Sequence, residues 1–457
     1  MVLNIENLGI IKQARIDLSK QFILFCGRNS TGKTYASYIL QAFLEDGSIY
    51  PLACIKEIIN QLLETGTFKI TEEYIHEWLE ANCKSVMEHT GSIFGISDTT
   101  RDKLFSKFNL SVTYTEIDFE NTLRTPINAQ MTEGAFIWKI TKEEHSDIVK
   151  IESNQDLSVL SNTNSIRTAA LICNILRNLA FRNTSNVRML TVERNSIYTF
   201  KTELSLSRNE LIDQIQQAGK SDINVFDIVT RSSRRYPQAI RSSLRIANDL
   251  ETVSKYESPF ACIADDIEKN MLLGEVSMTK NGDVEFHAYG MAKSKKLPFH
   301  LSSSIVKTMA SLVIYLRHIA KIGDTLIVDE PEMNFHPDVQ ILLARIFAML
   351  TNMGLRIIVS THSDYIIREL NNLIMAYAIL NKKDDDSIIS DLGYTKQMLL
   401  NYNEVKVLYF NKTSKTIVNV TPLPIDQEGF TMDTIDSTIN NQNVAAEILY
   451  AHLLEVQ

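Results

Sequence analysis

Residues 22–34 read FILFCGRNSTGKT, and this stretch decides the fold. A short apolar run rich in strand formers comes first, a glycine-bounded loop follows, and residues 35–44 (YASYILQAFL) then have helical periodicity. The loop matches the pattern G-x-x-x-x-G-K-[ST], and the order of strand, loop and helix is the context that supports such a match. The sequence therefore predicts a phosphate-binding loop made of Gly27, Arg28, Asn29, Ser30, Thr31, Gly32, Lys33 and Thr34.

Each part of this loop has an expected role in holding a nucleoside triphosphate. Backbone N–H groups and the N-terminus of the following helix form a nest that attracts phosphate oxygens, and small residues let the backbone come close. Lys33 would neutralise the β and γ phosphates, and the Thr34 hydroxyl would coordinate Mg²⁺. ATP and Mg²⁺ are therefore the expected cofactors.

A second apolar strand ends in two carboxylates far downstream, where residues 325–331 read TLIVDEP. An apolar strand followed by Asp-Glu is typical of a phosphate-hydrolysing site. In such a site the aspartate holds Mg²⁺ and the glutamate takes a proton from the attacking water, and we assign these roles to Asp329 and Glu330. Acidic residues after a strand are also common as ordinary helix caps, so this assignment depends on the upstream loop.

A third strand, residues 355–359, is followed by Ser360, Thr361 and His362. Ligands of α/β sheets bind at the carboxyl ends of the strands, so the three strand ends should converge on one crevice. His362 is then expected to contact the γ-phosphate, and a purely structural histidine is the alternative.

Composition limits the classes of protein that remain. The chain has 457 residues, of which 44% are apolar and 22% charged, which is typical of a folded globular protein with about two or three lobes. The net charge of −9 means that nucleic acid would have to bind to a local basic patch. The five cysteines lie far apart, which favours a reducing compartment over disulfides or zinc.

Apolar stretches of the sequence are all far shorter than the roughly 20 residues that span a bilayer. The N-terminal segment MVLNIENLGIIKQARIDL is not a signal peptide either, because polar residues interrupt its apolar ones. We therefore expect a soluble cytoplasmic protein without a membrane partner.

These motifs together resemble the ATP-binding-cassette (ABC) superfamily. The loop GRNSTGKT, the run DEPEMNFHP at 329–337 and the THS at 361–363 are similar to its soluble branch. That branch includes RecF, the chromosome-maintenance (SMC) heads and the OLD-like AAA family ATPases of bacterial anti-phage defence. The resemblance covers residues 1 to about 45 and about 185 to 457. It implies an α/β fold, in which an ABC-ATPase head with a P-loop NTPase mixed sheet and flanking helices carries inserted helical and α/β accessory lobes.

The resemblance also implies a contact across a dimer. Residues 300–317 lie where the family has its signature serines and a helix that points at the nucleotide of the partner subunit. Ser303, Ser304 and Lys307 resemble the S-S-x-x-K form of this signature, although Ile305 stands where the family has glycine. A serine N-cap on an amphipathic helix is the local alternative.

Two other positions resemble parts of the family's site. Residues 189–196 (MLTVERNS) are similar to a strand that ends in Pro-Ala-Glu-Arg. Glu193 and Arg194 would then sense the nucleotide or brace the loop, and a plain buried ion pair is the alternative. Asn334 and His336 occupy the stretch that, in the family, crosses to the partner's active site.

The distance along the chain between Lys33 and Glu330 requires inserted segments. We expect a split head of residues 1–50 and 185–457, an accessory α/β lobe at 51–184 and a helical insertion at 200–260.

Periodicity predicts the secondary structure of these insertions. The predictions are helices in 51–90 and 166–182, alternating strands in 111–155 (SVTYTEIDFE, FIWKITKEE), and a hairpin with an Asn-Gly turn in 275–300.

One segment, RSSRRYPQAIRSSLR at 231–245, is rich in arginine and has no acidic residue. Guanidinium groups bind phosphates, so this segment is the candidate for nucleic-acid contact, and a solvated or carboxylate-paired helix face is the alternative. Its arginines are Arg231, Arg234, Arg235, Arg241 and Arg245.

The resemblance implies an ATPase that converts ATP and water to ADP and phosphate. It also implies a head-to-head dimer around ATP and leaves open whether higher oligomers form. In an anti-phage system such as Septu or PARIS it would act as sensor and scaffold for a separate effector, a nuclease or a toxin. We expect no fused Toprim nuclease, because the acidic run at 384–386 lies in a polar loop. The alternatives are a RecF- or SMC-like ATPase of DNA repair or recombination that binds DNA directly, and a transporter motor, which the missing transporter signature disfavours.

Overall fold

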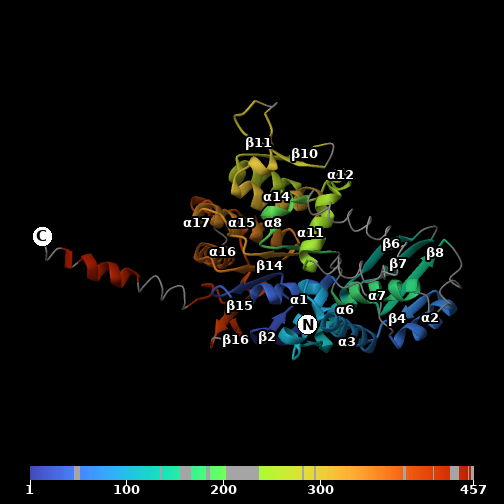
Figure 1. Cartoon of the computed structure of the whole chain (residues 1–457). Helices are drawn as coiled ribbons and strands as arrows, with labels where there is room; N and C mark the ends of the chain where they lie inside the picture. Colours follow the sequence, from blue (N-terminus) through green and yellow to red (C-terminus); the bar gives the residue numbers. More distant parts are fainter. Residues whose placement is uncertain are drawn as a thin grey trace, which may run out of the picture.

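The computed structural model describes residues 1–45, 52–133, 136–154, 166–181, 186–201, 236–279, 282–292, 295–383, 387–414, 416–432, 442–450 and 452–453. A mixed nine-stranded sheet lies at the centre, with helices on both faces (Figure 1). In sheet order its strands are β5 (Asn109–Thr113), β1 (Val2–Leu8), β2 (Ile11–Asp17), β16 (Val418–Leu423), β15 (Val405–Lys412), β3 (Phe22–Cys26), β14 (Arg356–Thr361), β13 (Thr325–Asp329) and β9 (Val187–Leu190). The expected α/β fold, a mixed sheet with flanking helices, is confirmed.

The strands β15, β3, β14, β13 and β9 run parallel to one another. Every residue of β3, β13 and β14 is buried. Helices cover both faces of such strands. The strands therefore contain runs of consecutive apolar residues instead of an alternation of apolar and polar residues. The β1, β2 and β5 strands pair antiparallel at one edge.

Alternate residues of β3 point to the two faces of the sheet and join two hydrophobic cores. On one face, Ile23 and Phe25 pack in a core with helices α1 (Lys33–Glu45), α3 (Glu72–Glu88) and α7 (Ile166–Ala180). On the other face, Phe22 and Leu24 pack in a core with α14 (Ser304–His318), α15 (Pro337–Asn352) and α16 (Asp364–Lys383). Figure 1 shows these two groups of helices on opposite sides of the sheet.

The segment between α1 and β9 contributes to the central sheet and also forms a sheet of its own. Its strand β5 pairs with β1, whereas β4 (Thr67–Lys69), β8 (Ile148–Ser153), β7 (Phe136–Lys142) and β6 (Ile127–Glu133) form a separate four-stranded sheet. Its other helices are α2 (Cys54–Thr65), α4 (Thr90–Phe94), α5 (Asp98–Phe105) and α6 (Glu116–Arg124). The rings of Phe43 and Phe181 meet edge to face at 5.3 Å, which ties this segment to α1.

The sequence prediction of strand throughout 111–155 is wrong for α6. The residues EIDFENTLR form a helix because Thr115 and Asp118 make a capping box at its start. The Asp118 carboxylate accepts from the Thr115 backbone N–H at 3.0 Å, which satisfies a donor that a strand would have used in pairing. The helices expected in 51–90 and 166–182 are present as α2, α3 and α7.

The second half of the chain adds a small antiparallel sheet and several short helices. The expected hairpin is formed by β10 (Gly274–Met278) and β11 (Val284–Ala288), with β12 (Leu297–Pro298) beside them, and its Asn281 lies outside the described residues. The remaining helices are α8 (Arg194–Ile197), α11 (Gln238–Asn248), α12 (Leu250–Val253), α13 (Ala261–Ile267), a π-helical turn Glu268–Leu272, α17 (Ser387–Asp391) and the 3₁₀ turns Phe299–Leu301, Lys396–Met398 and Tyr402–Glu404.

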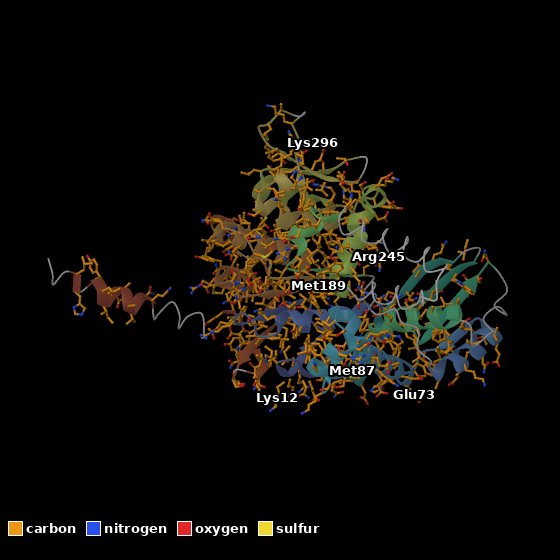
Figure 2. All side chains as sticks on the ribbon, viewed as in Figure 1. Lys12, Glu73, Met87, Met189, Arg245 and Lys296 are labelled. Atoms are coloured by element: carbon orange, nitrogen blue, oxygen red, sulfur yellow. The ribbon has the colours of Figure 1, made fainter. Side chains whose placement is uncertain are left out.

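A final helical segment, 442–450, has exposed side chains throughout, and Figure 1 shows it apart from the body. Figure 2 shows the exposed Lys296 beside β11 and the exposed Lys12 and Glu73 on the opposite side of the molecule. Within the described residues, no helix has both the length and the apolar content that crossing a membrane requires.

Candidate nucleotide site

Three strand ends meet at one edge of the sheet. The register pairs Thr361 with Cys26 and Asp329 with Ser360, so the parallel strands β3, β14 and β13 end side by side. Gly27, His362 and Glu330 are the residues that follow these ends. The structure therefore brings together the three motifs that are far apart in the sequence.

The glycines of the phosphate-binding loop have conformations that other residues adopt only with strain. Gly27 has a φ of 139°, and a Cβ there would lie 2.7 Å from the carbonyl oxygen of Phe410. Gly32 has a φ of 90°, and a Cβ there would lie 2.9 Å from Cγ1 of Ile11. Contacts this short do not occur for real Cβ atoms, so the loop needs glycine at both ends. The loop passes directly into α1, whose first residue is Lys33.

The Lys33 side chain folds back over this loop. Its ammonium group donates to the carbonyl oxygens of Gly27 and Arg28, each at 3.0 Å. Burial lowers the pKa of Lys33, and the nearby carboxylates of Glu330, Asp329 and Glu332 oppose this shift. The group is thus a partly desolvated cation beside acidic residues, which suits the binding of a phosphate.

Asp329 and Thr34 form the candidate Mg²⁺ site. The Thr34 hydroxyl donates to Oδ2 of Asp329 at 2.7 Å, and the Ser360 hydroxyl donates to Oδ1. Burial raises the pKa of Asp329, whereas the hydrogen bonds from Ser360 and Thr34 lower it. Hydroxyl and carboxylate oxygens are the ligands that Mg²⁺ prefers, so this donor set fits the ion.

Glu330 and His362 lie beside the Mg²⁺ candidates. Glu330 has a φ of 45°, a backbone conformation that is uncommon for a long side chain and that clusters at functional sites. Its Oε1 lies 3.8 Å from Nδ1 of His362. The side chains of Glu330 and His362 are 29% and 40% exposed, so both are accessible to a ligand.

Arg194 braces the turn that carries the two carboxylates. Its guanidinium donates to the main-chain oxygens of Asp329 at 2.7 Å and Glu330 at 2.8 Å, and also to that of Thr191 at 2.9 Å. Arg194 is buried, and burial lowers its pKa to about 10 against the opposing effect of Asp329. Of the alternatives set out for Arg194, this geometry corresponds to a brace, because Glu193 is exposed and the guanidinium donates to backbone oxygens.

The signature candidates lie at the start of α14. Ser303 is its N-cap residue, and both Ser303 and Ser304 are exposed. The Lys307 ammonium donates to the carbonyl oxygen of His300 at 2.8 Å. Among the described residues, no hydrogen bond joins this helix start to the phosphate-binding loop. Asn334 and His336, after the carboxylates, are exposed as well.

Only part of the arginine-rich segment falls within the structure. Arg231, Arg234 and Arg235 lie outside the described residues. Arg241 donates to the carbonyl and hydroxyl oxygens of Ser92 at 3.0 Å and so ties α11 to α4, whereas Arg245 is exposed.

Sequence reasoning missed Glu332, which is buried beside His362. The side chains of Glu330, Glu332, Asn334, Gln340, His362 and Tyr365 are among those that line one hollow at this edge of the sheet. The available signal was a glutamate two positions after the catalytic candidate Glu330. The sequence does not show that this side chain is buried, because its burial depends on the packing of β14.

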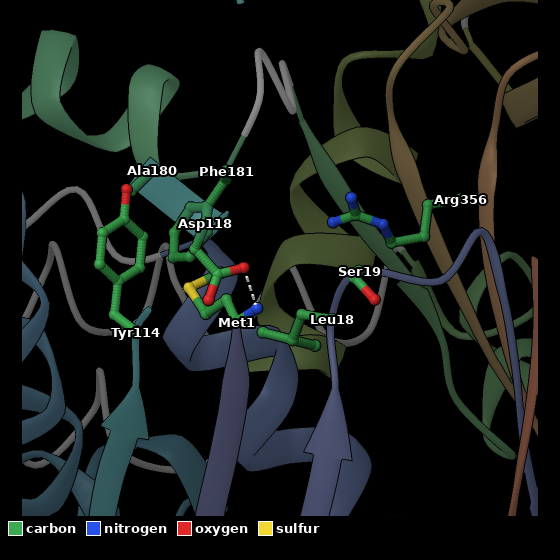
Figure 3. A pocket seen from close by; sticks show the side chains of 8 residues that line it. All are labelled: Met1, Leu18, Ser19, Tyr114, Asp118, Ala180, Phe181 and Arg356. Atoms are coloured by element: carbon green, nitrogen blue, oxygen red, sulfur yellow. Dashed lines mark hydrogen bonds and ion pairs between the residues drawn. The ribbon is translucent and has the colours of Figure 1, made fainter. Parts of the chain in front are cut away.

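A second, smaller hollow lies elsewhere (Figure 3). It is lined in part by Met1, Ser19, Asp118 and Arg356, and the Met1 amino group forms an ion pair with Asp118. Arg356 is the first residue of β14, so this hollow lies at the opposite end of the strand from His362. It is therefore separate from the nucleotide site.

The sheet and the loop after β3 define a P-loop ATPase. The family model described as "AAA ATPase domain" matches residues 1–367, and the chain belongs to this family. No curated protein matches the chain in sequence.

Two solved structures are similar to the chain at low TM-scores. One is the crystal structure of the SmcHead bound to the C-winged helix domain of ScpA, with 12% identity, a TM-score of 0.36, and coverage of 93% of this chain and 98% of that chain. The other is the Smc head domain with an extended coiled coil bound to the C-terminal domain of ScpA from Pyrococcus furiosus. It has 11% identity, a TM-score of 0.34, and coverage of 98% of each chain.

Proposed function

We propose that this protein binds ATP with Mg²⁺ at the carboxyl ends of β3, β14 and β13 and hydrolyses it to ADP and phosphate. The observation that best supports this is the 2.7 Å bond between Thr34 and Asp329, because it joins the two expected metal ligands, which are 295 positions apart in the chain. Membership of the AAA ATPase domain family agrees with it.

The residues would divide the chemistry as follows. Loop N–H groups and the Lys33 ammonium bind the phosphates. When a phosphate binds, Lys33 gives up its hydrogen bonds to the carbonyl oxygens of Gly27 and Arg28. Thr34 and Asp329 would hold Mg²⁺, which would supply positive charge to the phosphate oxygens. Glu330 accepts a proton from the attacking water, and His362 donates to the γ-phosphate.

We further propose that two copies of the chain close around the nucleotide. The exposed Ser303 and Ser304 stand at the N-terminus of a 15-residue helix, and such an end supplies hydroxyl and backbone N–H donors together with a favourable dipole. A γ-phosphate bound at the Lys33 site of one copy would accept hydrogen bonds from this helix end of the other.

ATP turnover and assembly test these two proposals. Purified protein should hydrolyse ATP with Mg²⁺ and stop when EDTA removes the metal. Sedimentation velocity of Glu330→Gln should show a shift from monomer to dimer on addition of ATP and Mg²⁺. A metal-independent rate would contradict the Mg²⁺ assignment, and an unchanged sedimentation coefficient would contradict closure.

In the cell, we propose that this ATPase senses infection and holds a separate effector, a nuclease or toxin, in bacterial anti-phage defence. This role is supported by the S-S-x-x-K form of Ser303, Ser304 and Lys307 and by the strand end at 189–196, which resemble the OLD-like branch. Phage plating on cells that express the wild-type or Lys33→Ala protein together with the genes encoded beside it tests this role, as does co-purification of the products of those genes. Salt-dependent retention of DNA without any change in plating would instead favour a repair or recombination ATPase.

A further inference from the structure

Glu332 is a buried carboxylate whose hydrogen bonds converge on one of its two oxygens. Oε1 accepts from the Thr361 hydroxyl at 2.8 Å and from the backbone N–H of His362 at 2.8 Å. Nδ1 of His362 lies 3.1 Å from the same oxygen. Oε2 is buried and has no hydrogen-bond partner in the described part of the chain.

This arrangement is costly for a residue that serves stability alone. Only 6% of Glu332 is exposed, and a buried charge loses its hydration, which hydrogen bonds to a single oxygen offset only in part. A buried oxygen without a partner adds to that cost. An apolar side chain of similar volume would avoid both penalties, so the contact with His362 calls for a functional explanation.

The Glu332 carboxylate places an acceptor beside one ring nitrogen of His362. An acceptor at 3.1 Å from Nδ1 favours the proton on that atom, and the hydrogen bond made by one ring nitrogen decides the state of the other. Nε2 is then the nitrogen available to a ligand. His362 is 40% exposed and lines the same hollow as Glu330, so a ligand bound there reaches it.

We propose that Glu332 is a positioning residue for ATP hydrolysis, which holds His362 by Nδ1 so that Nε2 faces the γ-phosphate. This inference rests on the proposed ATPase activity. Because the phosphate oxygens only accept hydrogen bonds, Nε2 has to donate while Nδ1 donates to Glu332. The contact between Glu332 and Nδ1 holds the ring in the orientation that this requires. Glu332 acts through His362 and does not itself contact the nucleotide.

A double-mutant cycle of kcat tests this role. Glu332→Gln keeps the shape and an acceptor for Thr361 but removes the charge, and it should lower kcat about 10-fold with little change in the KM for ATP. His362→Ala should lower kcat further. Adding Glu332→Gln to His362→Ala should then have no additional effect, because the group through which Glu332 acts is already gone.

Glu369 supplies the matched control, because it is also a buried carboxylate. Its partners include Arg345, at 2.6 Å, and Asn372 and Tyr394. Glu369→Gln removes the charge that pairs with Arg345 and should lower the melting temperature, yet leave kcat close to that of the wild type. If kcat falls in both variants in proportion to the loss of melting temperature, Glu332 has a structural role alone.

The protonation of His362 gives a second readout that needs no ATP turnover. Long-range ¹H–¹⁵N spectra of histidine-labelled protein should show Nδ1 protonated in the wild type, with assignment by loss of the signal in His362→Ala. Glu332→Gln should shift this signal toward the Nε2–H form or a mixture.

The possible results separate the two proposals. Multiplicative kcat losses in the double mutant, or an Nδ1 that is unprotonated in the wild type, would overturn the positioning role while leaving the ATPase proposal intact. A wild-type protein without any ATPase activity would overturn the proposed function, and the spectra would still decide how His362 is held.

Discussion

The hydroxyl of Thr34 donates a 2.7 Å hydrogen bond to Oδ2 of Asp329, although the two residues are 295 positions apart in the chain. The bond joins the first turn of α1 to the end of β13. It shows that the phosphate-binding loop and the acidic strand end are parts of one site, so substitutions in either should affect the same activity.

Lys33→Ala should weaken ATP binding by at least about 100-fold, because a charge-assisted contact to phosphate is lost and the loop N–H groups cannot replace the cation. Isothermal titration with ATP and Mg²⁺ measures the affinity. Lys12→Ala removes an exposed lysine of β2 and serves as the control with unchanged affinity. Wild-type affinity in Lys33→Ala would mean that nucleotide does not bind at this loop.

Glu330→Gln should bind ATP normally but lower kcat by about 100-fold or more, because the amide occupies the same space yet cannot take the proton of the attacking water. Phosphate release and nucleotide affinity are measured on the same preparation. The exposed Glu73 provides a control, Glu73→Gln, that should turn over like the wild type. Turnover of Glu330→Gln at the wild-type rate would place the base elsewhere.

Ser303→Arg should block ATP-dependent closure and hydrolysis while leaving nucleotide binding by the single chain largely intact. The reason is that a bulky side chain would stand at the exposed N-cap of α14, where the partner's γ-phosphate is proposed to bind. Ser390→Arg, at another exposed serine, should neither prevent closure nor slow hydrolysis.

Mixing Ser303→Arg with Lys33→Ala chains tests whether the site is shared. A mixed dimer would combine both defects at one composite site and leave the other site intact. Recovery of ATPase activity in the mixture is the expected result. If mixed dimers form, as shown by differently tagged chains, and activity does not recover, the shared site is wrong.

Arg194→Met should lower the free energy of unfolding by about 3 kcal/mol, because buried main-chain oxygens at Asp329 and Glu330 lose a charged donor. Urea denaturation measures this change. Arg245→Met, on the exposed face of α11, should stay within about 0.5 kcal/mol of the wild type. Equal effects of the two substitutions would contradict the bracing role of Arg194.

The sequence by itself determined the local parts of this protein. The apolar strand, the glycine-bounded loop and the helix from 22 to 44 follow from residue types a few positions apart, since glycine conformation and helical periodicity are local properties. The strand that ends at Asp329 and the strand that precedes His362 were predictable for the same reason. So was the hairpin of β10 and β11.

Only the tertiary structure decided the order and register in which these parts become neighbours. The positions of β13 beside β14 and of β14 beside β3 are long-range pairings, and local pattern contains neither strand order nor register. The same holds for β5, which joins the central sheet from within the inserted segment. Arg194 and Glu332 acquire their partners through packing, because a charged side chain has a defined partner only where the fold buries it.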